Sequence, residues 1–368
     1  MKIAILIRKY DKSSGGLERY CVELTEKLAA IHDIHVFAQE FSVENSLTQF
    51  HKIPKFFEKP RFINQLIFSL LTKKATHGKF VIVHSHELVT HANVYTIHVP
   101  CFKSIWIEIG GLKKVLRIIN TFISPRKILY LWLENKQMKQ INNKKFISVS
   151  EYLARNIYQC YPGIQNISIV HPGISEDFTR IEEKKLRNEL SIPSNSFLIL
   201  LVANDFIKKG VPTSIRSIEL LNNKNIHLIV AGKGRISKIN IPDSISNNIH
   251  FLGQITNMRS IYSEADLLIH PTLVDTFGMA PLEAMSMNIP VILSNMQYCG
   301  FSEHLDESEA IILNNPKDEV ELAKQIDFLY RNDSARNKIA KKGNIKSKSI
   351  NWDNALHKTQ EIYDLIKI

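Results

Sequence analysis

The chain has 368 residues, of which 44% are hydrophobic and 23% charged, which excludes a disordered chain and favours two globular domains. Its four cysteines stand far apart without a C-x-x-C pair, which disfavours a disulfide framework and fits a reducing, cytoplasmic interior. Residues 1–172 carry a net charge of +12 and the remainder carries −1, giving +11 in all. We therefore expect one half of the chain to meet something anionic: nucleic acid, an acidic membrane surface or an anionic substrate.

Short runs rich in isoleucine and valine recur along the chain and alternate with amphipathic segments of helix length. The first run, residues 2–7, is too short for a signal-peptide core or a membrane span and predicts a buried strand. Further strands are predicted at 34–38, 80–85, 93–98, 146–150, 167–173, 197–203, 226–232, 249–253, 267–271 and 290–294. Such runs, separated by helices, are typical of parallel sheets covered on both faces. The predicted fold class is α/β, with two doubly wound Rossmann-like domains facing across a cleft.

Pro172 and Gly173 interrupt this pattern before a charged segment and set the predicted domain boundary. We expect an N-terminal domain of residues 1–172 and a C-terminal domain of residues 173–351. Residues 352–368 have helical spacing and are predicted to return to the N-terminal domain. Open parallel sheets bind ligands beyond the carboxyl ends of their strands, so residues that directly follow strands are the candidates for a site.

Two loops that follow strands suit a phosphate-bearing ligand. Gly15 and Gly16 precede an amphipathic helix, so their backbone can approach a ligand and the helix N-terminus favours an anion. The alternative is an ordinary strand-to-helix turn. Lys208 and Lys209 would present two ammonium groups to a pyrophosphate. The alternative there is a solvated pair, with one lysine held by Asp205.

The segment of residues 270–285 has the most features of a binding site. Pro281 suits the first turn of a helix, and Gly278 exposes neighbouring backbone amides that can bind an anion or a hydroxyl. Glu283 can accept two hydrogen bonds from a vicinal diol such as a ribose, and Asp275 can do the same for a second ring. The alternative is that Glu283 only complements the helix dipole, an effect of about 0.3–1 kcal/mol.

Histidines cluster near three strand ends. His84 and His86 face the same side of one strand, which is compatible with a metal pair, but no third ligand follows at a suitable local spacing. A buried ring hydrogen-bonded to a carbonyl is therefore the default for each. His98, at a strand end just before Pro100, is the best candidate for an imidazole that faces the site.

Several motifs are missing from the sequence. No D-x-D pair occurs, which argues against a carboxylate-held divalent metal on a nucleotide diphosphate. Neutralising a diphosphate would then fall to lysines and helix N-termini. Without G-x-G-x-x-G, a P-loop or G-x-S-x-G, the dinucleotide-redox, P-loop and serine-hydrolase interpretations have no support.

The basic excess concentrates in residues 61–74 and 102–140, where bulky apolar residues alternate with cations. The most crowded part holds Trp106, Lys113, Lys114 and Arg117. Basic amphipathic segments can lie on anionic membranes, and the alternative is that they cover a core.

Taken together, these motifs resemble the family 4 retaining glycosyltransferases, which have the two-domain GT-B fold. The resemblance covers nearly the whole chain: "GGLER", "YTIH", "VSEYLARNI" with "IVHPGI", "KKG", the two acids separated by seven residues, and the tryptophan-containing last helix. Within the family the chain looks most like the lipopolysaccharide core glucosyltransferase I group, through "NDFIKKGV", "HPTLVDTFGMAPLEA" and "YCGFSEHL".

The resemblance implies roles for most of these residues. Gly15 and Gly16 would face the donor diphosphate and the acceptor, and Lys209, with Lys208 beside it, would bind the diphosphate. The residues implied to contact the rest of the donor are Glu283 for the ribose, and Asp275 with the backbone of Gly278 and Met279 for the transferred sugar. His98 falls at the family's active-site histidine, although the core glucosyltransferase group depends on an aspartate in this neighbourhood. Asp275 stands where the family usually has a glutamate.

The reaction implied is transfer of a hexose with retention, through an oxocarbenium-like transition state in which the leaving phosphate helps to deprotonate the acceptor. It would need no metal and no cofactor, with a UDP-sugar as co-substrate. The acceptor would be a glycolipid or of lipopolysaccharide type, and the enzyme would be cytoplasmic, on the anionic inner face of the membrane. A sugar-nucleotide epimerase of the same fold is the first alternative, and a basic nucleic-acid-binding protein the second.

Overall fold

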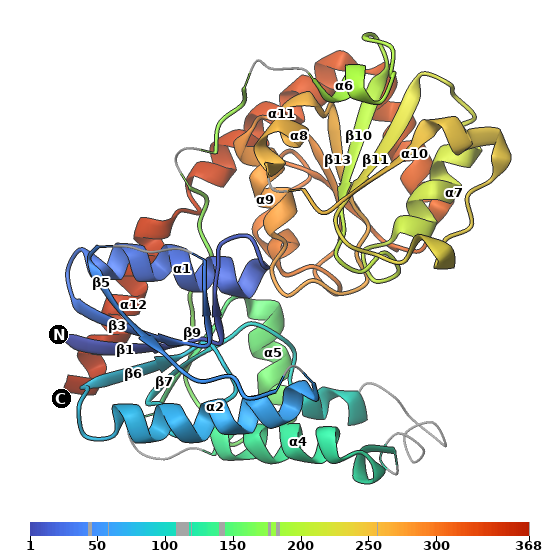
Figure 1. Cartoon of the computed structure of the whole chain (residues 1–368). Coiled ribbons are helices and arrows are strands. Elements are labelled where there is room, and N and C mark those ends of the chain that lie inside the picture. Colours follow the sequence, from blue (N-terminus) through green and yellow to red (C-terminus); the bar gives the residue numbers. More distant parts are fainter. Residues whose placement is uncertain are drawn as a thin grey trace. The chain divides into compact units, whose positions relative to one another are not determined.

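The structure is a computed structural model (Figure 1). It describes residues 1–42, 46–57, 59–107, 118, 120–139, 144–175, 178–181, 185–255 and 257–367. The chain forms two compact units: unit 1 is Met1–Gly173 with Trp352–Ile368, and unit 2 is Ile174–Asn351. The boundary predicted from the sequence, after residue 172, lies one residue before the observed one.

A parallel sheet forms the centre of unit 1, and within the described residues its strand order is β5-β3-β1-β6-β7-β8-β9. These strands are β1 (Lys2–Leu6), β3 (Asp33–Ala38), β5 (Thr48–Lys52), β6 (Ile82–Ser85), β7 (Val94–Ile97), β8 (Lys145–Ser148) and β9 (Ile167–Ile169). A second small sheet pairs β2 (Lys9–Tyr10) with β4 (Glu40–Phe41). The chain runs from β1 outwards to β5 and returns to β6 on the other side of β1. The space between β1 and β6 is therefore a topological switch point, the usual ligand position in open α/β sheets.

Helices cover the sheet of unit 1 (Figure 1). They are α1 (Gly16–Ala29), α2 (Arg61–Thr76), the 3-10 helix η1 (Phe102–Trp106), α4 (Pro125–Met138), α5 (Glu151–Cys160) and α12 (Trp352–Lys367). Helix α12 packs beside α1, where the ammonium of Lys27 lies 2.9 Å from the carboxylate of Asp353. The hydroxyl of Tyr363 lies 2.7 Å from Nδ1 of the buried His84. The predicted return of the C-terminal helix to the N-terminal domain is confirmed.

Unit 2 has the same design, with the strand order β12-β11-β10-β13-β14-β15 within the described residues. Its strands are β10 (Phe197–Val202), β11 (Ile226–Ala231), β12 (Ile249–Gly253), β13 (Leu267–His270), β14 (Val291–Ser294) and β15 (Ile311–Leu313). Its α-helices are α6 (Leu186–Glu189), α7 (Val211–Leu221), α8 (Met258–Glu264), α9 (Met279–Ser286), α10 (Glu319–Arg331) and α11 (Asp333–Lys348). Its 3-10 helices are η2 (Ile236–Lys238), η3 (Asp243–Asn248) and η4 (Gly300–His304). The switch point of unit 2 lies between β10 and β13.

Strand β10 shows why the apolar runs form central strands. Leu198 and Leu200 belong to the core on one face of the sheet, whereas Phe197, Ile199 and Leu201 belong to the core on the other face. Because both faces are covered, every position of such a strand favours an apolar side chain, and each large one contributes about 1.5–3 kcal/mol on burial. The predicted pair of doubly wound domains is confirmed. In the part of the chain that the structure describes, no helix has the length and apolar character needed to cross a membrane.

Candidate functional site

Two loops meet at the switch point of unit 2, one after β10 and one after β13. The backbone N–H of Leu273 donates to the carbonyl of Lys208 at 2.7 Å and ties the loops together. Gly210, with φ of +76°, lies against the second loop so closely that a Cβ there would be 2.1 Å from the carbonyl oxygen of Pro271. Only glycine allows this approach, so the packing of the two loops requires the glycine of the "KKG" segment.

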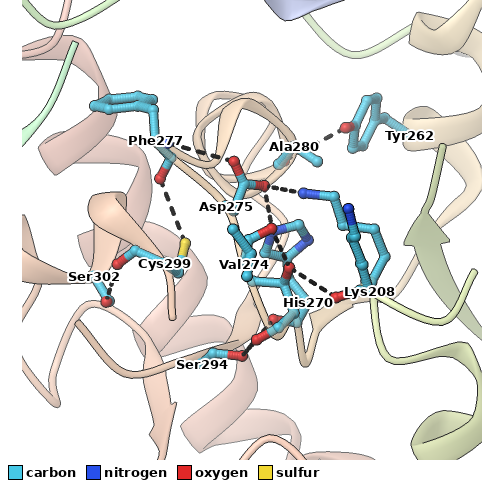
Figure 2. A network of polar contacts seen from close by, with 12 residues as sticks. Lys208, Tyr262, His270, Val274, Asp275, Phe277, Ala280, Ser294, Cys299 and Ser302 are labelled. Atoms are coloured by element: carbon cyan, nitrogen blue, oxygen red, sulfur yellow. Dashed lines mark hydrogen bonds and ion pairs between the residues drawn. The ribbon is translucent and has the colours of Figure 1, made fainter. Parts of the chain in front are cut away.

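A network of three side chains is centred on Asp275 (Figure 2). Its Oδ2 accepts from the ammonium of Lys209 at 2.5 Å and faces Nε2 of His270 at 2.9 Å. Lys209 comes from the loop after β10, and His270 is the last residue of β13. The structure therefore brings Lys209 and Asp275, both predicted as site residues, into direct contact, and it adds His270, which the sequence analysis did not select.

The protonation of this network follows from its burial. Burial alone would raise the pKa of Asp275, but the ammonium of Lys209 and the ring of His270 outweigh it and hold that pKa well below its usual range. Burial lowers the pKa of His270, and Asp275 only partly opposes this. At neutral pH Asp275 is therefore a carboxylate and His270 is neutral. The geometry assigns the His270 proton to Nε2, which leaves the buried Nδ1 without a hydrogen-bond partner among the described residues.

The backbone of Asp275 is fixed as firmly as its side chain. Its N–H donates to the carbonyl of Tyr298 at 2.7 Å, and its carbonyl accepts from the N–H of Gly300 at 3.1 Å. Oδ2 accepts from both Lys209 and His270, whereas Oδ1 accepts one longer bond, from the N–H of Phe277 at 3.4 Å (Figure 2). Oδ1 is therefore the oxygen with capacity for a further donor, such as a sugar hydroxyl.

Gly278 begins the next element of the site. Its φ of +111° lies in the left-handed region, and a Cβ there would be 2.9 Å from Sγ of Cys299 and 3.2 Å from Cβ of Phe301. Helix α9 starts at Met279 without a side-chain cap. The amides of its first turn thus follow directly on Asp275 in the chain, as the sequence predicts for a site that binds an anion or a hydroxyl.

Glu283 is only 6% exposed on α9, and its Oε2 accepts from the hydroxyl of Tyr262 at 2.7 Å. Tyr262 lies on α8 and also reaches the carbonyl of Ala280 at 3.4 Å (Figure 2). A second residue absent from the sequence analysis therefore orients this carboxylate. The sequence gives no signal for it, because a tyrosine at an apolar helix position looks like any core residue.

Lys208 differs from its neighbour. Its side chain is 67% exposed, and its ammonium lies 3.9 Å from the carboxylate of Asp205. This contact is the local ion pair with Asp205 that the sequence analysis named as an alternative for one of the two lysines. The structure does not bring the Lys208 head group into the network of Asp275.

The remaining predicted residues, Gly15, Gly16 and His98, lie in unit 1. Gly15 has extended backbone at φ of 173°, and a Cβ on Gly16 would meet nothing within 4 Å. Neither glycine is required by strain, and the space beside Gly16 is open. The preceding loop is held by Asp11, whose carboxylate accepts from the N–H of Ser13 at 2.9 Å.

His98 follows β7 and is buried, with its Nε2 3.0 Å from Nδ1 of His86. Burial and the neighbouring His86 hold the pKa of His98 well below its ordinary value, so the ring is neutral. The default of a carbonyl partner is wrong for His84, whose two nitrogens lie 2.7 Å from the hydroxyls of Tyr363 and Thr96. With both nitrogens engaged, His84 does not form a metal pair with His86.

The predicted membrane-facing segment is described only in part. Lys113, Lys114 and Arg117 lie outside the described residues. Among the described residues, Phe122 and Ile123, which precede α4, are exposed, and Trp132 on α4 is exposed as well.

Two family models match the chain. The model described as glycosyltransferase family 4 matches residues 14–178, and the model described as glycosyl transferases group 1 matches residues 182–346. The chain therefore combines a glycosyltransferase family 4 domain with a glycosyl transferases group 1 domain that follows it.

Individual relatives agree with this class. The glycosyltransferase MJ1607 of Methanocaldococcus jannaschii is 24% identical over 99% of this chain and 98% of its own length. The lipopolysaccharide glucosyltransferase WaaG of Escherichia coli is 27% identical over 41% of this chain and 42% of its own length. The crystal structure of WaaG matches with a TM-score of 0.79 at 20% identity and covers 99% of each chain. Anabaena HepE in complex with UDP-glucose matches with a TM-score of 0.71 at 16% identity, over 100% of this chain and 99% of its own. The fold is GT-B, as the resemblance implied.

Proposed function

We propose that this glycosyltransferase moves a hexose, with retention, from a nucleotide-diphosphate sugar to a hydroxyl of a glycolipid or lipopolysaccharide-core acceptor. The observation that carries the proposal is the contact of Lys209, Asp275 and His270 at the switch point of unit 2, directly before the helix that bears Glu283. A cation and two acids in this order suit the three parts of such a donor, namely diphosphate, sugar and ribose.

In this proposal each group has one partner on the donor. Lys209 binds the diphosphate, and Glu283, oriented by Tyr262, accepts from the ribose hydroxyls. Asp275 accepts from a hydroxyl of the transferred sugar through Oδ1, beside the amides of Gly278 and Met279. The complex of HepE with UDP-glucose supports a UDP-sugar as the donor.

The chemistry places positive charge on the sugar and negative charge on the leaving diphosphate. Lys209 and the first turn of α9 stabilise the leaving group as its bond to the anomeric carbon breaks. Asp275 is already held by Lys209 and His270 through one oxygen, which suits it to hydroxyl binding rather than to covalent attack. We infer that the leaving phosphate accepts the proton of the acceptor hydroxyl on the same face of the sugar. The neutral His98 is proposed to contact the sugar near its anomeric carbon.

We propose that no metal takes part, because the sequence has no D-x-D pair and Lys209 supplies the positive charge. Activity with UDP-glucose is then expected to persist in an excess of EDTA. A strict requirement for a divalent cation would overturn this part of the proposal.

The acceptor is proposed from the relatives, which include a lipopolysaccharide glucosyltransferase and an O-antigen biosynthesis glycosyltransferase. We also propose that α4 and the residues just before it meet an anionic membrane face, since Phe122, Ile123 and Trp132 are exposed and the same segment carries the exposed cations Arg126 and Lys136. The double variant Phe122→Ser, Trp132→Ser should lose sedimentation with phosphatidylglycerol vesicles and keep UDP affinity. Equal sedimentation of the variant would reject the membrane contact.

The proposal as a whole is tested with a panel of nucleotide sugars in a thermal-unfolding assay. A ligand at about 100 times its Kd adds about 2.7 kcal/mol to the free energy of unfolding. We expect stabilisation by at least one UDP-sugar, and NMR of the product should show the donor's anomeric configuration. If no nucleotide sugar stabilises the protein, the donor assignment fails, and an inverted product would reject retention.

A further inference from the structure

The switch points of the two units carry matching ion pairs. In unit 2, Lys209 from the loop after β10 meets Asp275 from the loop after β13 at 2.5 Å. In unit 1, Arg8 is the second residue after β1, and Glu87 is the second residue after β6. Nε of Arg8 lies 3.0 Å from Oε2 of Glu87. Each unit thus joins a cation and an acid across the position where α/β sheets bind ligands.

The pair in unit 1 is built from fixed groups. The carboxylate of Glu87 is only 10% exposed and also accepts from the backbone N–H of Arg8 at 3.2 Å. The backbone of Glu87 is held in turn by Ser85, whose hydroxyl donates to the Glu87 carbonyl at 2.9 Å. One edge of the guanidinium is therefore locked against Glu87. Its two terminal nitrogens have no hydrogen-bond partner within the described residues, and the Arg8 side chain is 34% exposed.

A second carboxyl group lies close to this pair. Glu18, in the first turn of α1, is near enough to Gly15 that a Cβ there would be 2.8 Å from its Oε2. Burial raises the pKa of Glu18, and Glu87 adds to the rise while Arg8 and Lys9 oppose it. The groups around this switch point thus combine guanidinium donors with carboxyl acceptors.

Their summed charge indicates the kind of ligand. The charges of Arg8 and Glu87 cancel, as do those of Lys9 and Asp11, whose ammonium and carboxylate lie 3.0 Å apart. Glu18 adds either a negative charge or, when protonated, none. An anion would gain little from such a set, whereas adjacent hydroxyl groups can accept from the guanidinium and donate to a carboxylate. A neutral sugar ring offers hydroxyls in that arrangement.

We propose that the Arg8–Glu87 pair is the binding site for the acceptor sugar, which it holds through two neighbouring hydroxyls. The inference rests on the proposed function, since it takes the acceptor to be a carbohydrate. Glu87 directly follows His86, whose Nδ1 lies 3.0 Å from Nε2 of His98. The same strand end therefore carries the acceptor site and the histidine that the proposed function assigns to the reaction.

The test measures binding of two kinds of probe to the full chain. Methyl α-glycosides of glucose, galactose and mannose are titrated by saturation-transfer NMR with UDP present at saturation, and UDP is titrated separately by calorimetry. Arg8→Met removes the guanidinium at similar length, and Arg8→Lys keeps the charge without the second donor edge. Lys27→Met, which breaks the exposed ion pair with Asp353 in the same unit, is the matched control.

We expect at least one glycoside to bind the wild type beside UDP. Arg8→Met should weaken glycoside binding by about tenfold or more, the usual effect of losing hydrogen bonds from a charged group. Arg8→Lys should weaken it less, and UDP affinity should stay within about twofold in every variant. If Arg8→Met does not fold, Arg8→Lys alone tests the inference, and this variant must still weaken glycoside binding.

Three results would overturn the inference: no glycoside binding to the wild type, displacement of the glycoside by UDP, or unchanged glycoside binding in the Arg8 variants. Failure of the proposed function gives a different pattern, in which UDP does not bind at all. Glycoside binding that is lost with Arg8 would still stand in that case.

Discussion

Lys209 and Asp275 lie 66 positions apart in sequence, and their side chains meet at 2.5 Å across the switch point of unit 2. The lysine follows the first strand of the unit and the aspartate follows the fourth, so the contact exists because β10 pairs with β13. With His270 on the same carboxylate oxygen, the two residues form one charged network rather than two separate binding groups.

The first prediction compares the two neighbouring lysines. Lys209→Met should weaken UDP binding by about tenfold or more, because a hydrogen bond to a charged group contributes about 1.5–3 kcal/mol. Lys208→Met should change it by no more than about twofold, since that ammonium is exposed and pairs only loosely with Asp205. Calorimetric titration with UDP measures both. Equal losses of UDP affinity in the two variants would contradict the different roles inferred for the exposed Lys208 and for Lys209, which contacts Asp275.

Asp275→Asn tests the other half of the pair. The variant leaves the largely buried Lys209 without its carboxylate, so the free energy of unfolding should fall by about 1–3 kcal/mol in urea titrations. Transfer of glucose from UDP-glucose should fall by about tenfold or more, because the amide does not replace the ionised acceptor. UDP lacks the sugar, so its affinity should fall less than the transfer rate. A variant with wild-type turnover would remove Asp275 from the sugar site.

Glu283→Gln addresses the ribose. The amide keeps the shape of the side chain but loses the charge that favours hydrogen bonds from two hydroxyls, so affinity for UDP should fall by about tenfold. Tyr262→Phe removes the 2.7 Å hydrogen bond that orients this carboxylate and should give a smaller loss in the same direction. Both are measured by calorimetry with UDP and with uracil, which carries no ribose. Unchanged UDP affinity in Glu283→Gln would reject the ribose assignment.

Runs of apolar residues in the sequence located the central strands and two of the edge strands, β9 and β12, but not the edge strands β5 and β15. Strand β5, Thr48–Lys52, reads "TQFHK" because an edge strand is covered on one side only and tolerates polar residues. Strand β15, Ile311–Leu313, has only three residues, too few to show a period. Neither strand therefore shows the run of apolar residues from which the other strands were predicted.

The candidate site was predictable one loop at a time. One segment of nine residues holds Asp275, Gly278 and Glu283, so the sequence alone suggested that they act together. Position 278 favours glycine because its φ is +111°. The contact between Lys209 and Asp275 could not be predicted from the sequence, because it depends on the order of the strands in the sheet. His270 was not predicted as a site residue because it is the last residue of an apolar strand. Its position at the strand end is the only sequence feature that indicates a role in the site.

Gly278 and Gly16 allow a matched pair of alanine variants. Gly278→Ala places a Cβ 2.9 Å from Sγ of Cys299 at a positive φ, so we expect a loss of about 1–3 kcal/mol in the free energy of unfolding. Gly16→Ala meets nothing within 4 Å at the start of α1, so stability should stay the same or rise by up to about 1 kcal/mol. Urea titration measures both. A stable Gly16→Ala protein with lost activity would support a ligand at that loop, whereas a stable Gly278→Ala protein would contradict the packing described for α9.

The buried histidines of unit 1 predict how stability depends on pH. Burial lowers the pKa of His86 to about 3, and those of His84 and His98 also lie well below the ordinary value, so the folded protein keeps these rings neutral. The unfolded chain takes up protons on them below about pH 6.5. Between that pH and the folded pKa the unfolded state binds more protons, so the free energy of unfolding falls as pH falls. The slope is up to about 1.4 kcal/mol per pH unit for each histidine, and it becomes small as the pH rises above about 6.5, where the unfolded chain loses these protons as well.

Tryptophan fluorescence reports the unfolding of unit 1, the unit that holds these histidines, because Trp106, Trp132 and Trp352 all belong to it. Urea titrations at pH 7.5, 6.5 and 5.5 should show a shallow change over the first step and a steep loss over the second. His86→Gln should reduce the slope below pH 6.5 by the contribution of one histidine. His357→Gln, at a side chain that is 77% exposed, should leave the slope unchanged. A wild-type slope in His86→Gln would mean that His86 is already protonated in the folded protein at these pH values, and its neutral contact with His98 would have to be abandoned.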